Sequence, residues 1–170
     1  MSPPVFGIVG WKNSGKTTLT SRLIAEFAAR GYKVAAVKHA HHGFDVDQPG
    51  RDSHLFREAG AREVAVVSSK RVAIMWELRD EEEPGLDEVL TRLHGSELIL
   101  IEGFKTHDHA KIEVRRRESA SQEPLAGAVP GVVAIAADHP VDAGGLASFG
   151  LNDIEAIADF ITRFTGMASD

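Results

Sequence analysis

An eight-residue segment rich in glycine has the residue types needed to bind phosphate. Gly10-Trp11-Lys12-Asn13-Ser14-Gly15-Lys16-Thr17 matches the phosphate-loop pattern at every fixed position. The two glycines let successive backbone N–H groups point at phosphate oxygens. Lys16 adds positive charge at the β- and γ-phosphates, and the Thr17 hydroxyl can ligate magnesium. We predict that nucleotide phosphates are bound by Gly10, Lys12, Asn13, Ser14, Gly15, Lys16, Thr17 and Thr18.

A carboxylate is expected on the magnesium side of such a loop, at the end of a neighbouring strand. Glu102 follows the apolar run Leu98–Ile101, at the strand end where α/β sheets place their ligands. It would hold magnesium directly or through a water; the alternative is a surface glutamate that ends a strand. Gly103 would let a backbone N–H approach the γ-phosphate.

The stretch 38–52 has no apolar periodicity and is rich in histidine and aspartate. It could be a transition-metal site, a switch loop in which Asp45 or Asp47 positions metal or water, or a solvated polar loop. In an extended chain, Asp45 and Asp47 would point the same way. We name Asp45 as a metal ligand, and Lys16, Asp47 and Glu102 as catalytic candidates. Arg51 could bind the phosphate of a second ligand.

Hydrophobic patterning predicts the elements that position these groups. Short β-branched runs predict strands, the last of them at 132–136; they cover 5–9, 33–37, 64–68, 72–76, 98–101, 112–114 and 132–136. Helical spacing and capping residues predict helices at 17–30, 53–59, 86–93 and 152–164. Ser53 and Asn152 are the expected N-caps. This order implies an α/β three-layer fold with a mostly parallel sheet and an antiparallel addition at 64–76.

Composition narrows the class of protein. The chain has 170 residues and a net charge of −6, which argues against general nucleic-acid binding. It contains no cysteine, which excludes disulfides, thiolate zinc sites and thiol catalysis. No signal peptide is visible, and the longest apolar runs are too short to cross a membrane. We expect a soluble, cytoplasmic protein with one domain over residues 1–170 and no membrane partner.

Taken together, these segments resemble the molybdopterin-guanine dinucleotide biosynthesis proteins of type B (MobB). The resemblance covers about residues 5–117 and is most specific at 47–53 and 102–105. The segments that carry it are 7–18, 37–45, 47–53, 59–61, 100–105 and 111–115.

The resemblance implies an adapter protein with a P-loop NTPase fold that binds GTP and Mg²⁺, forms a homodimer and hydrolyses GTP weakly. Its implied partner is the molybdopterin guanylyltransferase enzyme, which joins GMP to molybdopterin. Molybdopterin itself is a further candidate ligand, for which Arg51, Lys105 and Lys111 could line an anionic pocket. The chain departs from the pattern at Arg51, where lysine is expected. Trp11 stands where related dimeric NTPases often carry lysine, which puts trans-activation by Lys12 in doubt.

Guanine selectivity has no familiar signature, because the Asn-Lys-x-Asp tetrad is absent. Our hypothesis is that Asp138, which follows the last predicted strand, accepts hydrogen bonds from guanine N1 and N2. The alternative is an ordinary turn aspartate before His139 and Pro140.

Two other functions remain open at this point. A metallochaperone GTPase would deliver nickel through His39, His41 and His42, although the lack of cysteine and of a histidine-rich tail counts against it. A small-molecule kinase would use the cluster at 115–117 to clamp a transferred phosphoryl group, although a basic strand end is the preferred interpretation.

Overall fold

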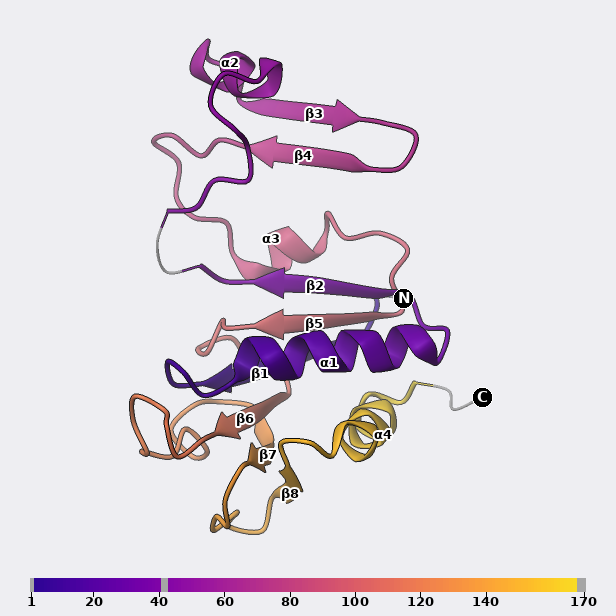
Figure 1. Cartoon of the computed structure of the whole chain (residues 1–170), viewed down its shortest axis with the longest axis vertical. Coiled ribbons are helices and arrows are strands. Elements are labelled where there is room, and N and C mark those ends of the chain that lie inside the picture. The colour runs from indigo at the N-terminus through magenta and orange to yellow at the C-terminus, as the bar shows by residue number, and fades with distance from the viewer. Residues whose placement is uncertain (1, 41–42, 168–170) are drawn as a thin grey trace. The chain divides into compact units, whose positions relative to one another are not determined.

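The computed structural model describes residues 2–40 and 43–167, which form two compact units. The first unit comprises residues 1–39 and 90–170, and the second comprises residues 40–89. Figure 1 shows the elements of both. The phosphate loop and Glu102 belong to the first unit, and Asp45, Asp47 and Arg51 belong to the second.

The first unit is built on a six-stranded sheet in which every pair of neighbours is parallel. Its strands are β1 (Val5–Gly10), β2 (Val34–Lys38), β5 (Leu98–Glu102), β6 (Lys111–Arg115), β7 (Val132–Ala137) and β8 (Ala147–Gly150). Their order is β2-β5-β1-β6-β7-β8. Because β1 lies between β5 and β6, the loops that follow these three strands emerge at the same edge. The predicted α/β class is confirmed.

Helices α1 (Lys16–Ala29) and α4 (Ile154–Thr165) pack against each other and against β1, as Figure 1 shows. Alternate side chains of the strands, such as Phe6 and Ile8, meet the apolar faces of both helices in one buried cluster. Gly31, with φ +90°, follows α1 as predicted. Among the described residues, no helix is both long and apolar enough to cross a membrane.

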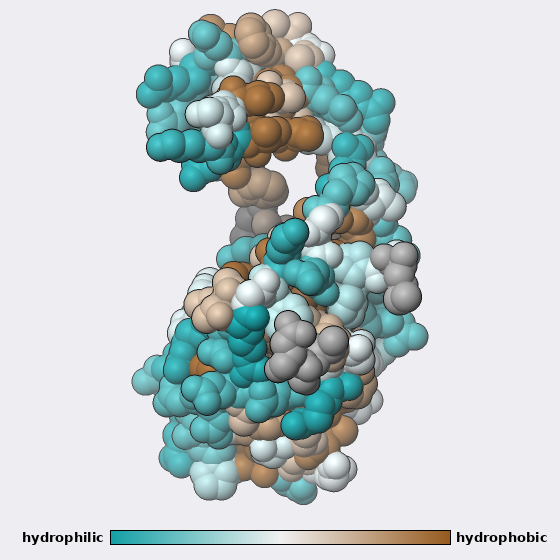
Figure 2. All heavy atoms as spheres, turned by 90° about the vertical axis from the view of Figure 1, so that its right-hand side faces the viewer, coloured by the Kyte–Doolittle hydropathy of each residue, from teal (hydrophilic) through white to brown (hydrophobic). Residues whose placement is uncertain are grey.

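The second unit contains α2 (Asp52–Glu58) and the antiparallel hairpin β3 (Glu63–Val67) and β4 (Val72–Trp76). The hairpin confirms the predicted antiparallel pair. Helix α3 (Leu86–Leu90) crosses the boundary between the units. Figure 2 shows hydrophobic residues at the surface in the upper part of the view. The exposed apolar side chains of α2 and the hairpin are Leu55, Phe56, Val66, Val67, Val72 and Ile74.

Three local predictions are wrong. Residues 132–136 do not form the last strand, because β8 follows. Asn152 does not cap α4: its side chain accepts a hydrogen bond from Arg22, and Asp153 takes the N-cap position. Ser53 lies inside α2, where its hydroxyl donates to the Asp47 carboxylate at 2.9 Å. At both predicted caps the side chain forms a hydrogen bond outside the helix end: Asn152 with Arg22 of α1, and Ser53 with Asp47 of the preceding loop.

Candidate functional site

The phosphate loop connects β1 to α1 as predicted, and its two glycines are there for different reasons. Gly15 has a φ of +91°, the left-handed conformation that side chains rarely adopt. At Gly10, a Cβ atom would lie 2.4 Å from the Ser14 hydroxyl and 2.8 Å from the carbonyl oxygen of Val114. The loop therefore needs glycine at the first position for space and at the second for backbone conformation.

The Lys16 ammonium lies over the loop. Its Nζ donates to the carbonyl oxygens of Gly10 at 3.0 Å and of Trp11 at 2.9 Å. Burial lowers the pKa of Lys16. The negative charge of Glu102 raises this pKa, whereas the nearby positive charges of Lys105 and Lys38 lower it further. A partly desolvated ammonium among other cations interacts strongly with an anion that enters the site.

The expected hydroxyl and carboxylate lie together at the carboxyl ends of the strands. Thr17 Oγ1 donates to both oxygens of Glu102, at 3.2 and 3.1 Å. Lys38 is paired with Glu102 in the β2–β5 register, and its Nζ lies 3.8 Å from Glu102 Oε1. Hydroxyl and carboxylate oxygens are the ligands that Mg²⁺ prefers, so the donor set fits this ion.

A pocket of about 480 Å³ opens over the loop. It is lined by Asn13, Ser14, Gly15, Lys16, Thr17, Thr18, Glu102, Arg116 and Glu118. Arg116 reaches it from the end of β6, contacts Glu118 at 3.2 Å and passes close to Gly15. In the sequence, Arg116 stands out only as part of the basic cluster 115–117 that the kinase interpretation would use. The fold brings it to the loop because β6 is the immediate neighbour of β1.

The irregular segment 118–130 supports the loop from outside. The backbone N–H of Ala120 donates to the Lys12 carbonyl at 2.9 Å, and the Trp11 indole N–H donates to the Glu123 carbonyl at 2.8 Å. The segment is anchored in turn by Glu113, whose buried carboxylate accepts the N–H groups of Leu125 and Ala126 at 2.9 and 2.8 Å.

Glu113 remains charged although it is buried. Burial by itself would raise its pKa, but the paired guanidinium of Arg115 and the two backbone N–H groups outweigh that effect and lower the pKa. An ionised carboxylate inside the protein thus fixes the segment that supports the phosphate loop.

Asp138 follows β7 and has protein partners on both oxygens. Its Oδ1 accepts the Arg117 N–H at 3.1 Å and lies 2.6 Å from His139 Nδ1, while Oδ2 lies 3.8 Å from Arg116 Nε. The pKa of Asp138 is lowered chiefly by its hydrogen bond with His139. The backbone N–H of Arg117 and the charge of Arg116 lower it as well. Asp138 does not line the pocket over the loop. Its contact with guanine stays a hypothesis.

The acidic candidates of the second unit gather around Arg57. Its Nη1 lies 3.0 Å from Asp45 Oδ1 and 3.4 Å from Asp47 Oδ2. The backbone N–H of Asp47 donates to Asp45 at 2.9 Å, so the two carboxylates reach Arg57 from a turn and not from an extended chain. That hydrogen bond and the Arg57 guanidinium lower the pKa of Asp45. Arg51 precedes α2 as its N-cap and is exposed.

The histidine candidates come from the stretch 38–52. His39 stacks on Phe104 with ring centroids 4.4 Å apart, and His41 and His42 lie outside the described residues. Within 2–40 and 43–167, no three histidine, aspartate or glutamate side chains are arranged to hold a metal ion.

The placement of Lys111 in an anionic pocket is wrong. Lys111 is fully buried, and its ammonium donates to the carbonyl oxygens of His107, His109 at 2.8 Å and Pro130 at 2.9 Å. The Gly103 N–H also has a partner, the Ile8 carbonyl at 3.2 Å, so a contact with the γ-phosphate would require this bond to open.

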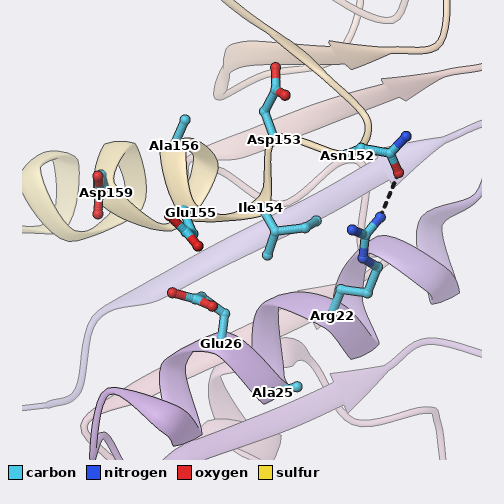
Figure 3. A pocket seen from close by; sticks show the side chains of 9 residues that line it. All are labelled: Arg22, Ala25, Glu26, Asn152, Asp153, Ile154, Glu155, Ala156 and Asp159. Carbon is cyan, nitrogen blue, oxygen red and sulfur yellow. Dashed lines mark hydrogen bonds between the residues drawn. The ribbon is translucent and has the colours of Figure 1, made fainter.

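A second hollow, of about 820 Å³, lies between α1 and α4 (Figure 3). Arg22 donates to Asn152 at its rim at 2.8 Å, and the carboxylates of Glu26, Glu155 and Asp159 belong to its lining. None of the predicted site residues lines it.

Comparisons with known proteins agree on one family. The family model of molybdopterin guanine dinucleotide synthesis protein B matches residues 5–138. The molybdopterin-guanine dinucleotide biosynthesis adapter protein of Escherichia coli is 40% identical over 164 residues, covering 95% of this chain and 93% of that protein. The Haemophilus influenzae protein of the same name is 37% identical over 166 residues, covering 95% and 89%. The crystal structure of Bacillus subtilis MobB matches with a TM-score of 0.76 at 25% identity, covering 97% of this chain and 99% of that one.

Proposed function

Because the chain belongs to the family of molybdopterin guanine dinucleotide synthesis protein B, a family of biosynthesis adapter proteins, we propose that it performs its role by binding GTP with Mg²⁺. This family membership favours the adapter over the metallochaperone and kinase interpretations. The protein then acts with the enzymes that form molybdopterin guanine dinucleotide.

The observation that carries the proposal is the grouping of Lys16, Thr17 and Glu102 at one pocket. The loop amides and the Lys16 ammonium would bind the β- and γ-phosphates, and Thr17 and Glu102 would hold the metal ion. When bound, Mg²⁺ offsets the negative charge of the phosphates. Arg116 extends the positive lining of this pocket.

Weak hydrolysis is part of the proposal. Lys16 would stabilise negative charge as a water attacks the γ-phosphate in line, and Glu102 is the nearby carboxylate available to orient that water. Asp47, in the second unit, remains the further candidate. Its carboxylate accepts hydrogen bonds from the Ser53 hydroxyl and the Gln48 backbone N–H.

We also propose which partners the protein binds. The adapter name of the relatives supports a contact with the molybdopterin guanylyltransferase enzyme. Molybdopterin, an anionic pterin, would be a second ligand, and the working unit would be a homodimer in the cytoplasm.

A calorimetric titration with GTP and ATP, each with Mg²⁺ and with or without molybdopterin, tests this function. We expect selective GTP binding, and a loss of about 100-fold or more in Lys16→Ala, because a charge-assisted contact to phosphate is removed. Lys33→Ala is the matched control, since Lys33 is an exposed lysine of the same unit outside the pocket. GTP affinity that is the same in Lys16→Ala and in the wild type would reject the proposal.

A further inference from the structure

We propose that Lys105 is a specificity-determining residue that recognises the terminal phosphate of the bound nucleotide, and that Trp11 positions its ammonium beside the phosphate loop. This inference rests on the proposed binding of GTP and extends it to the choice between a nucleoside triphosphate and a diphosphate.

Trp11 contacts two ammonium groups at once. Lys105 Nζ lies 4.6 Å from the centroid of the Trp11 ring, and the Trp11 backbone carbonyl accepts Lys16 Nζ at 2.9 Å. The ring is fixed in place by its own N–H, which donates to the Glu123 carbonyl at 2.8 Å. One loop residue therefore positions the lysine of the phosphate loop and a second lysine from a segment more than 90 residues away.

The chain after β5 is bent so that Lys105 reaches Trp11. Gly103 and Phe104 have φ values of +100° and +49°, so two consecutive residues are left-handed. Such a conformation is strained for phenylalanine. It is maintained by the stacking of Phe104 on His39 and by the Gly103 N–H, which donates to the Ile8 carbonyl. A Cβ atom on Gly103 would lie 2.9 Å from His39 Cβ, so the turn also requires glycine for space.

The charges around the loop make Lys105 available to an anion. Within 2–40 and 43–167, no carboxylate forms an ion pair with Lys105; its contact is the neutral ring of Trp11. Glu102 is shared by Thr17 and Lys38, and Glu118 contacts Arg116. Since a phosphate attracts an ammonium more strongly than an aromatic face does, we expect Lys105 to leave the ring for a phosphate within reach.

The position of Lys105 favours the terminal phosphate. It follows Glu102 by three residues, at the same sheet edge as Thr17, which is the metal side of the loop. Its charge acts on Lys16, and the phosphate-loop lysine contacts the β- and γ-phosphates. Lys105 does not line the pocket while it lies on Trp11, so recognition of the phosphate requires its side chain to leave the ring.

Tryptophan fluorescence can test this inference, because the chain has two tryptophans. In a Trp76→Phe background, Trp11 alone reports on the Lys105 contact. GTP with Mg²⁺ should change the Trp11 emission more than GDP does. Lys105→Met should abolish this difference, lower GTP affinity about tenfold and leave GDP affinity within about twofold. Lys33→Met is the matched control and should behave as the parent.

A second pair of variants tests the role of the ring. Trp11→Phe keeps an aromatic face and should retain the preference for GTP over GDP, whereas Trp11→Leu should reduce it. Equal losses of GTP and GDP affinity in Lys105→Met, or no loss of either, would overturn the role of Lys105 and leave the GTP-binding proposal standing. If the parent binds neither nucleotide, both proposals fail.

Discussion

The Thr17 hydroxyl donates to both oxygens of the Glu102 carboxylate, at 3.2 and 3.1 Å, although 85 residues separate them in sequence. The β1–β5 register brings this about, because Ile8 near the end of β1 pairs with Glu102 at the end of β5. The first helical turn after the phosphate loop therefore lies beside the carboxylate, with two oxygen ligands ready for one cation.

Glu102→Gln should weaken nucleotide binding only when magnesium is present. The amide keeps the size of the side chain and loses the charge that a divalent cation requires. We expect GTP affinity with Mg²⁺ to fall about tenfold or more, and GTP affinity in EDTA to change little. Isothermal titration under both conditions measures the difference. Glu58→Gln, at an exposed position of α2, is the control, and equal losses with and without Mg²⁺ would contradict a metal-side role.

Glu113→Gln should destabilise the fold and change its response to acid. Removal of one partner of a buried ion pair costs about 3 kcal/mol, and Glu113 is 1% exposed and paired with Arg115. Its folded-state pKa lies below the ordinary value of 4.5. The stabilisation is therefore fully present above about pH 4.5 and is lost as the pH falls through the folded-state pKa.

Urea unfolding from pH 7 to pH 3 measures both effects. The free energy of unfolding of Glu113→Gln should be lower at pH 7 and should depend less on pH below 4.5. Glu118→Gln, an exposed position on the same segment, should remain within about 0.5 kcal/mol of the wild type. Parallel pH profiles of the wild type and Glu113→Gln would show that the carboxylate does not stabilise the fold through its charge.

His109 should stay neutral well below the pH at which histidines usually gain a proton. Burial first, and then the positive charges of Lys111 and His107, lower its pKa from 6.5 to about 4. Between these values the unfolded chain binds a proton that the folded protein does not, so this group makes stability fall as the pH drops from 6.5 to 4. An NMR titration of the imidazole C–H signals, assigned with His109→Gln, reports the value directly. A midpoint near 6.5 would refute it.

Gly7→Ala should destabilise the protein, because β1 runs directly against the His109 ring. A methyl group at Gly7 would lie 2.5 Å from His109 Nε2 and 2.9 Å from Lys111 Cγ. Overpacking of this kind costs about 1–3 kcal/mol. Gly85→Ala is the matched control, since a Cβ there meets no atom within 4 Å. Thermal melts of both variants measure the effect, and a Gly7→Ala melting temperature equal to that of the control would show that the ring moves aside freely.

Local patterns are sufficient to predict much of this site. The phosphate loop, the strand before it and the strand that ends at Glu102 are each encoded by a few consecutive residues, so residue types and their periodicity indicate them. Strand β8 was missed because Ala-Ser-Phe-Gly at 147–150 has no β-branched residue and no apolar run. It forms a strand through its parallel pairing with β7.

Contacts between distant segments have no signature in a single sequence. The Trp11–Lys105 pair, the arrival of Arg116 at the loop and the anchoring of 118–130 by Glu113 all depend on strand order. Lys111 was misplaced because its strand, β6, lies inside the sheet between β1 and β7; of the three carbonyls around its ammonium, those of His107 and His109 are local and only that of Pro130 comes from a later segment.

The position of β1 between β5 and β6 has a consequence for how the protein is made. Both neighbours of β1 are encoded about a hundred residues after it. At an elongation rate of about 5–20 residues per second, β6 would be synthesised about 5–20 s after β1. During this interval the phosphate loop has no sheet to support it, so nucleotide can be captured only late in synthesis, and a pause in translation before residue 98 would prolong the exposure of the apolar β1 strand.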